Sequence, residues 1–234
     1  MVGFRPRLWP TVATVPALAI LVALGTWQMQ RLAWKTDLLA ARDAALAAPP
    51  VPLDAGTSPD DLRFRRGEVT GTFDHAHELY LGPRVYDHHP GVHVLTPLRL
   101  ADGAVLLVNR GWVPQDLRDA ARRPAGQVEG VQTVRGVVLT PGPRGTYTPD
   151  NEPANNQWFY VDLDAMGRAI GAELLPFVLA SDDTDVPGGV PIGGQGRLHI
   201  KNDHLQYALT WYSLAVVLLV IYVLFHRRSR SNEP

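Results

Sequence analysis

Two long stretches without a charged residue constrain this chain more than any other feature of its sequence. The first runs from Leu8 to Gln30 and the second from Leu205 to Phe225. At about 1.5 Å of rise per helical residue, the 21 residues of the second stretch span roughly 31 Å, and a hydrocarbon core is about 30 Å thick. Each stretch therefore predicts a transmembrane helix, although the mean hydropathy of the whole chain, −0.05, is that of an ordinary soluble protein.

A soluble core helix or a cleaved signal peptide would fit these two stretches less well than a transmembrane span. The core helix of a soluble protein rarely stays free of charge over such a length. A cleaved signal peptide has a shorter apolar region and a cleavage site made of small residues, and Trp27-Gln28-Met29 offers no such site. We therefore expect both spans to remain in the mature protein.

The charges near the two ends of the chain predict its orientation. Arg5 and Arg7 precede the first span, and Arg227, Arg228 and Arg230 follow the second. Short tails that carry arginine stay on the cytoplasmic side, whereas a long intervening domain crosses largely regardless of its charge. The seven-residue leader lacks a Ser- and Arg-rich amphipathic stretch. We therefore expect a multi-pass protein of a bacterial inner (cell) membrane with both termini cytoplasmic.

This interpretation divides the chain into five segments, and the lipid bilayer surrounds the two helical ones. They are a cytoplasmic N-terminal tail, a first transmembrane helix, an extracytoplasmic (periplasmic) β-rich domain, a second transmembrane helix and a cytoplasmic C-terminal tail. Their expected bounds are residues 1–7, 8–30, 31–203, 204–225 and 226–234.

The region between the spans has mainly the pattern of β-strands. The first helix should extend to about Ala47, where Pro49 and Pro50 stop it. Runs rich in strand-forming residues follow, at Arg65–Phe73, Glu78–Leu81, Val92–Leu100, Ala104–Val113, Thr133–Thr140, around Trp158–Val161, and at Phe177–Ala180. Gly71 inside a strand indicates a bulge or a close backbone approach. The expected fold class is an α+β membrane protein, with two transmembrane helices flanking one mainly antiparallel β extracytoplasmic domain.

Three further segments complete the expected domain. Ala101-Asp102-Gly103 predicts a hairpin turn between two strands. Leu163–Ile170 has the pattern of an amphipathic helix, and residues 182–196 have the composition of a flexible Gly/Pro linker.

Composition and motifs exclude several classes of function. The chain has 22 Lys+Arg and 23 Asp+Glu, so its net charge of −1 gives no field for binding nucleic acid. It has no cysteine for a disulfide, a thiolate metal site or a CxxC redox site, and three methionines are too few to suggest a thioether copper site. The sequence also lacks the nucleophile-elbow, zinc-protease, P-loop and dinucleotide-binding motifs. We expect no enzyme and no nucleic-acid partner.

Histidines are concentrated in one part of the domain. Five of them lie within nineteen residues, at His75, His77, His88, His89 and His93. Imidazole is the commonest metal ligand in proteins, and His75 and His77 would share one face of a strand. The spacing matches no known ligand pattern, which favours a solvated loop region, and a metal site here stays open as the alternative.

His204 occupies a more informative position, directly before the second uncharged stretch. On a helix it shares a stripe with Tyr207, Ala208 and Trp211. The first span ends at the same membrane level with a second set spaced by three and four, made up of Trp27, Gln28, Arg31 and Lys35. An ionisable residue at a membrane boundary is a candidate functional group, although an interfacial histidine can also simply bind lipid headgroups. Imidazole, flat aromatic rings and nearby cations would suit a porphyrin, with iron on His204 and propionates near Arg31 or Lys35.

Several blocks of sequence together resemble the SURF1 (Surfeit locus 1, Shy1) family. They occur in order along nearly the whole chain: residues 24–28 (LGTWQ) with Arg31 and Lys35, residues 71–74 (GTFD), 78–84 (ELYLGPR), 91–98 (GVHVLTPL), 108–114 (VNRGWVP), 156–160 (NQWFY) with Asp162 and Leu163, and 202–212 (NDHLQYALTWY).

The resemblance implies a non-enzymatic assembly factor for cytochrome c oxidase, which acts when haem a is placed into the catalytic subunit. It implies haem a as a transiently bound cofactor, with His204 as the ligand of the haem iron. The catalytic subunit and other assembly factors are the implied partners. The expected cofactor-binding residues are thus His204, Trp27, Gln28, Arg31, Tyr207 and Trp211. The alternative is a cofactor-free membrane scaffold for an oxidase assembly intermediate.

Overall fold

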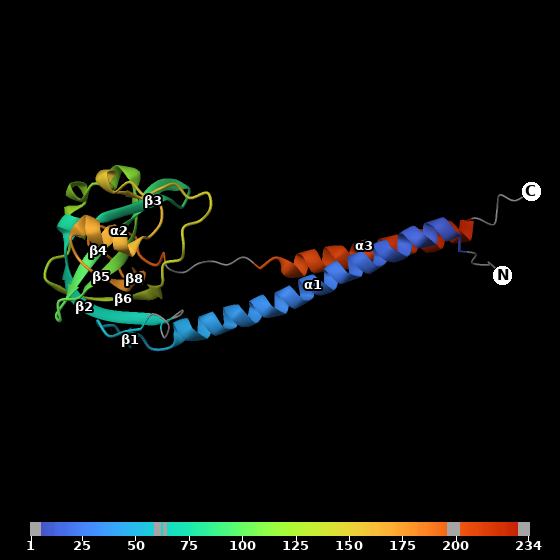
Figure 1. Cartoon of the computed structure of the whole chain (residues 1–234), viewed down its shortest axis with the longest axis horizontal. Helices are drawn as coiled ribbons and strands as arrows, with labels where there is room; N and C mark the ends of the chain where they lie inside the picture. The colour runs from blue at the N-terminus through green and yellow to red at the C-terminus, as the bar shows by residue number, and fades with distance from the viewer. Residues whose placement is uncertain (1–5, 59–61, 63–64, 196–201, 229–234) are drawn as a thin grey trace, which may run out of the picture. The chain divides into compact units, whose positions relative to one another are not determined.

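A computed structural model describes residues 6–58, 62, 65–195 and 202–228 of the chain. The chain divides into two compact units (Figure 1). One unit, the helix pair, comprises residues 1–41 and 199–234, and the other, the β-domain, comprises residues 42–198.

The helix pair consists of α1 (Leu8–Ala47) and α3 (His204–Arg228), which run side by side (Figure 1). Both helices are long and apolar enough to cross a membrane. The 40 residues of α1 extend over roughly 60 Å, about twice the thickness of a hydrocarbon core. The predicted extension to Ala47 is therefore confirmed, and Pro49 and Pro50 follow directly after it.

In its described residues, the β-domain contains eight strands and the helix α2 (Leu163–Ile170), besides the last residues of α1. The strands are β1 (Val51–Pro52), β2 (Arg66–Phe73), β3 (Leu79–Tyr86), β4 (His89–Leu100), β5 (Val105–Pro114), β6 (Val131–Leu139), β7 (Gln157–Trp158) and β8 (Leu174–Ser181). Helix α2 (Leu163–Ile170) has the predicted bounds. Asp162 caps its first turn by accepting a hydrogen bond from the Ala165 amide at 2.9 Å, and Gly171 ends it in the left-handed conformation.

Five strands close into a small barrel. Their order is β2-β6-β8-β5-β4, and β4 pairs back with β2 to complete the circle. The long strand β4 makes this closure possible, because its first part pairs with β3 and its last residues pair with β2. Pairings β2–β4, β2–β6, β3–β4, β4–β5 and β6–β8 are antiparallel, and β1–β2, β3–β7 and β5–β8 are parallel. The predicted two-helix, mainly antiparallel architecture is confirmed.

The central strand β5 is buried on both faces and separates two apolar clusters. Leu106 and Val108 point into the barrel, where they pack with Leu98, Phe177 and Leu179. The intervening Leu107 points the other way, because side chains alternate along a strand. It belongs to a cluster beneath α2 that also contains Leu95, Trp158, Met166 and Val178.

Gly71 lies where β2 pairs with both β4 and β6. A Cβ atom at this position would lie 2.5 Å from the carbonyl oxygen of Arg99, which is a backbone atom that cannot move aside. The close approach that the sequence predicted at this glycine is therefore present.

The expectation of a flexible linker at residues 182–196 is wrong for residues 182–195, and residue 196 lies outside the described residues. Ile192 exchanges two backbone hydrogen bonds with Trp112 of β5, at 2.8 and 2.9 Å. Gly111 and Gly193 permit this packing, since a Cβ at either would lie 2.0 Å or less from a carbonyl oxygen. The glycines that suggested flexibility instead let two backbones approach closely.

Two smaller predictions also need correction. The strand expected around Trp158–Val161 is only Gln157–Trp158, because the chain turns before it enters α2. His75–His77 form a short 3₁₀ helix instead of a strand, so these two histidines do not share a strand face. The hairpin turn at 101–103 is confirmed, with Gly103 at a positive φ of 88°.

Candidate functional site

Small residues let α1 and α3 pack closely. Gly25 is the buried residue of α1, and a Cβ there would lie 2.7 Å from the ring of Tyr212. Ala208 and Ala215 are buried on α3. Thr26 and Tyr212 also share a hydrogen bond between their hydroxyl groups at 3.1 Å. Small side chains and interhelical hydrogen bonds of this kind are what hold helices together in a membrane, and we call this contact line the helix seam.

His204 and Gln28 meet at one end of the helix seam. The Nδ1 atom of His204 lies 2.7 Å from Oε1 of Gln28. Because an amide oxygen can only accept a hydrogen bond, His204 Nδ1 carries the hydrogen in this contact. In the neutral imidazole the lone pair then resides on Nε2, and within the described residues His204 makes no second hydrogen bond. This arrangement fixes both the tautomer and the ring orientation, as the outer partners of metal-bound histidines do.

The other expected site residues are arranged differently around this pair. Trp211 is partly buried, whereas Trp27 and Tyr207 are 53% and 55% exposed. The exposed guanidinium of Arg31 lies over the ring of Trp34, 4.0 Å from its centroid. The structure therefore brings Gln28 to His204 and places two flat aromatic side chains on the exposed sides of the helices.

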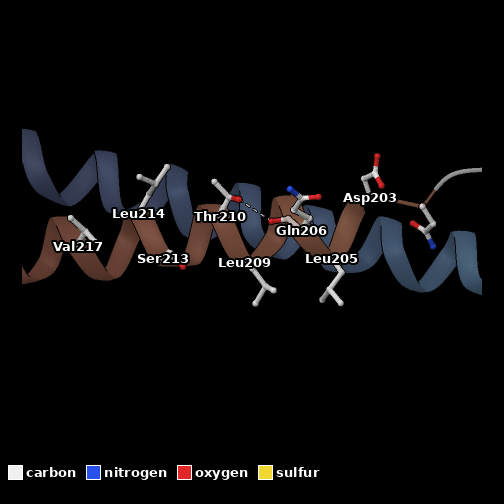
Figure 2. A pocket seen from close by; sticks show the side chains of 9 residues that line it. Asp203, Leu205, Gln206, Leu209, Thr210, Ser213, Leu214 and Val217 are labelled. Atoms are coloured by element: carbon white, nitrogen blue, oxygen red, sulfur yellow. Dashed lines mark hydrogen bonds between the residues drawn. The ribbon is translucent and has the colours of Figure 1, made fainter.

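A groove lies on one side of α3 (Figure 2). It is lined by Asn202, Asp203, Leu205, Gln206, Leu209, Thr210, Ser213, Leu214 and Val217. The Thr210 hydroxyl donates to the Gln206 carbonyl at 2.9 Å, which satisfies one of its polar groups within the helix. Figure 2 shows the groove on the near side of α3 with α1 behind it, and its lining lacks His204.

The far end of the helix seam contains a second histidine, which was not predicted as a site residue. His226 is 1% exposed, and its Nε2 accepts a hydrogen bond from the Arg7 amide at 3.1 Å while Nδ1 contacts the Tyr222 carbonyl at 2.8 Å. Both ring nitrogens are engaged. The sequence did contain a signal for it. His226 follows His204 by 22 residues, which is close to six full helical turns, so the two histidines lie on the same face of the helix.

The β-domain holds a buried ionic cluster that was also not foreseen. Glu78 and Arg123 have side chains only 2% and 1% exposed and form an ion pair. Arg110 lies 3.5 Å from the same carboxylate, and His75 lies 3.4 Å from it. The available signal was an arginine inside the apolar strand Val105–Pro114, since an arginine there must be paired if it is buried.

The charges in this ionic cluster set the protonation state of Glu78. Burial alone would raise the pKa of this carboxyl group. Hydrogen bonds from His75 and Arg123, with the charges of Arg123 and Arg110, outweigh burial and lower the pKa below its usual value. Glu78 is therefore a carboxylate at neutral pH.

The histidines of residues 75–93 are separated in the structure. His75 contacts the Val128 carbonyl at 2.9 Å, His77 contacts Asp74 at 2.9 Å, and His89 contacts the Asp87 carbonyl at 2.6 Å. Within the described ranges, no three His, Cys, Asp or Glu side chains are grouped so that they could hold a metal ion.

His93 is held neutral inside the β-domain. The Asn109 amide donates to its Nδ1 at 3.2 Å, and Asn109 is oriented by the Gly111 amide, which donates to Oδ1 at 3.1 Å. Burial, with a smaller contribution from the charge of Arg84, lowers the pKa of His93 from 6.5 to about 4.

This depressed pKa predicts a specific loss of stability in mild acid. The unfolded chain takes up the proton below pH 6.5 and the folded chain only near pH 4, so stability falls as the pH drops through this window. Between pH 7 and 5 the His93 contribution to the free energy of unfolding should fall by about 2 kcal/mol. Urea titrations of the wild type and His93→Gln would measure it. If the free energy of unfolding changed equally with pH in the two proteins, the depressed pKa of His93 would be contradicted.

Comparisons with known proteins identify the family of this chain. A model of the SURF1 family matches residues 15–216, which include Gln28 and His204. The SURF1-like protein of Monosiga brevicollis is 38% identical over 241 residues, covering 97% of this chain and 90% of the relative. Surfeit locus protein 1 of Homo sapiens is 41% identical over 209 residues, covering 82% and 69%. The SURF1-like protein of Caenorhabditis elegans is 33% identical over 235 residues, covering 90% and 71%. Since the match extends over both helices and the β-domain between them, the chain belongs to the SURF1 family.

Proposed function

We propose that this chain is a membrane-anchored assembly factor for cytochrome c oxidase that binds haem a at His204 and passes it to the catalytic subunit. Membership of the SURF1 family supports the general role in oxidase assembly. The observation that carries the haem-binding part is the contact between His204 Nδ1 and Gln28 Oε1 at 2.7 Å. It leaves the other imidazole nitrogen, Nε2, without a hydrogen bond among the described residues, at the end of an apolar helix.

The residues present at this end of the helix pair fit a haem. When bound, haem a would supply an iron that can take a nitrogen ligand and an apolar body that partitions into a bilayer. His204 would provide that nitrogen, and Gln28 would hold its ring. Trp27 and Tyr207 offer exposed flat surfaces, Trp211 adds a partly buried ring, and Arg31 offers a cation for the propionates. A single imidazole gives moderate affinity, which suits a carrier that must release its cargo.

The same surroundings support a carrier in preference to an enzyme. Acid–base or redox chemistry needs a positioned group that exchanges protons or electrons with the substrate. Within the described residues, the hydrogen-bond partner of His204 Nδ1 is an amide, and not the carboxylate that orients the histidine of a hydrolytic triad. The proposed partners are accordingly the catalytic subunit of cytochrome c oxidase, other assembly factors and the lipid bilayer.

Haem copurification tests this function directly. The full chain purified in detergent from cells that make haem a should show a Soret band. Gln28→Ala should weaken haem binding by about 10- to 100-fold, because losing the partner of a metal-bound histidine has effects of that size. Gln28→Glu should retain the band, since a carboxylate also accepts from Nδ1. Absence of a Soret band in the wild type would favour the cofactor-free scaffold.

We also propose a bacterial inner membrane with both termini on the cytoplasmic side. The arginine content of the two tails supports the orientation, with Arg5, Arg7, Arg227, Arg228 and Arg230 on one side. The relatives named above are eukaryotic, so their identity does not bear on the bacterial address. A topology reporter fused at residue 120 should report the opposite side from one at the C-terminus. Signals from the same side would contradict the orientation.

A further inference from the structure

One end of the β-barrel opens into a cavity that the proposed haem function does not use. Its volume is about 280 Å³. Its apolar wall is formed by Phe73, Val108, Val128, Val134, Val186 and Pro187. The ends of β2 and β8 and the strand β6 surround it, so it corresponds to a barrel mouth, which is a common position for small-ligand sites.

Arg110 is the buried charged side chain that lines this cavity. Its side chain is only 4% exposed, and its guanidinium lies over the ring of Phe73, 4.9 Å from the centroid. Nη2 donates to the Gly126 carbonyl. Nη1 is buried without a hydrogen-bond partner among the described residues, since the Glu78 oxygen 3.5 Å away is not placed to accept from it. A guanidinium has five N–H donors, so Arg110 is poorly satisfied for a buried cation.

Glu78 cannot compensate Arg110 fully, because it is already used by Arg123. Both oxygens of Glu78 accept hydrogen bonds from Arg123. Two guanidinium groups thus share one carboxylate in the interior of the domain. Burial, together with the charge of Arg123, lowers the pKa of Arg110 to about 10 even though Glu78 acts to raise it. The buried ionic cluster therefore has an excess of positive charge next to an open cavity.

Most of the other charged groups in the cavity wall are paired. Asp182 forms an ion pair with Arg66 at 3.5 Å, and Arg135 forms one with Glu68. Asp185 lines the cavity with an exposed side chain. A singly charged anion would balance the one excess positive charge of the ionic cluster, whereas a dianion would leave a second, uncompensated negative charge beside Asp185.

We propose that this barrel-mouth cavity binds a monocarboxylate carried on a small apolar group, with Arg110 as the recognition residue. A carboxylate is planar and has two acceptor oxygens, which matches the fork of a guanidinium. The apolar wall would take a group of the size of a branched aliphatic side chain. Two sources share this chemistry, a free short-chain carboxylate and the C-terminal carboxylate of a peptide that ends in an apolar residue. The proposal does not depend on haem binding.

The test compares ligands that differ only in charge. Isothermal titration of the full chain in detergent would use isovalerate against isovaleramide, and a peptide ending in valine with a free carboxylate against its C-terminal amide. Binding of either carboxylate in preference to its amide supports the proposal, and the pair that shows it identifies the source. Equal binding of acid and amide in both pairs, or no binding at all, overturns it.

Three variants locate the site. Arg110→Lys should weaken carboxylate binding by about 10- to 100-fold, as expected for the loss of hydrogen bonds to a charged group. Val186→Phe should block the cavity without substituting any residue of the ionic cluster, and it keeps the test valid if Arg110→Lys does not fold. The exposed Arg168→Lys on α2 is the matched control and should bind as the wild type does. Undiminished binding by folded Val186→Phe would place the carboxylate elsewhere and overturn the assignment.

Discussion

Replacing Glu78 with glutamine should lower the free energy of unfolding of the β-domain by about 3–5 kcal/mol, the usual effect of breaking a buried ion pair from one side. Glu78, Arg123 and Arg110 all have side chains that are at most 4% exposed. Glutamine keeps the shape of glutamate, so the loss comes from charge and not from a cavity. It leaves two guanidinium groups in the interior with no compensating carboxylate.

The expected loss of stability is large because Glu78 is the carboxylate that compensates both guanidinium groups. Arg123 donates to both oxygens of Glu78 and, through Nε, to the Leu117 carbonyl at 3.1 Å. The glutamine amide could still accept from Arg123 with its oxygen, but its NH₂ group would point another donor at a cation. Water cannot easily replace the lost interaction at this depth, and an unpaired buried charge is far more costly than an unpaired surface charge.

A matched control lies four residues away. Asp74 also contacts an arginine, Arg99, at 2.8 Å, but the Arg99 side chain is 54% exposed. Asp74→Asn should therefore change stability by only about 0–1 kcal/mol. Denaturant-dependent hydrogen exchange of the β4 and β5 amides in the full chain would report both variants from the same elements. Similar losses for Glu78→Gln and Asp74→Asn would show that burial does not govern this pair.

Much of the architecture could be predicted because it depends on local sequence patterns. Absence of charge over the length of a bilayer predicted both helices, and Pro49 and Pro50 predicted where α1 stops. Alternation and turn residues located most strands to within a few residues. The helix Leu163–Ile170 was predicted with its observed bounds from its amphipathic pattern, and in the structure Asp162 caps its start and Gly171 ends it.

The closure of the barrel could not be predicted in the same way. It depends on β4 pairing with two partners along one edge and on the parallel pairing of β5 with β8. The packing of residues 182–195 depends on Gly111 lying against Ile192, 81 residues further along the chain. Such contacts are fixed by the tertiary structure, and a Gly/Pro-rich composition by itself is equally compatible with a mobile linker.

In the candidate site, too, local spacing predicted some features and tertiary contacts fixed the others. The spacing of His204 and Trp211 predicted that they share a face of the second helix, and Gln28 was expected at the same membrane level on the first. The structure places all three at partly buried positions. Tyr207 was expected on the same stripe but is 55% exposed, because the helix seam is narrower than the stripe drawn from spacing alone. Glu78 and Arg123 are 45 residues apart, and no local pattern indicates that they form a pair.

Replacing His204 with alanine should reduce the haem that copurifies with the protein to the background level. The reason is that His204 is the proposed axial ligand and one imidazole supplies most of the specific attraction for the iron. His204 lies at the end of α3 and is partly exposed, so its removal costs little packing. The protein should still reach the membrane at the wild-type level, with an unchanged β-domain. Optical spectra of the purified full chain, normalised to protein, measure the effect.

His226→Ala is the control that distinguishes loss of the iron ligand from loosening of the helix pair. His226 lies in the same helix seam, is more deeply buried than His204, and has both ring nitrogens bonded to the backbone of Arg7 and Tyr222. If haem were lost through loosening of the helix pair, His226→Ala should lose at least as much as His204→Ala. If haem is lost through the iron ligand, His226→Ala should keep its Soret band, and added imidazole should restore a band to His204→Ala alone. A full haem complement with wild-type bands in His204→Ala would remove the ligand assignment and leave the cofactor-free scaffold as the better account of this family member.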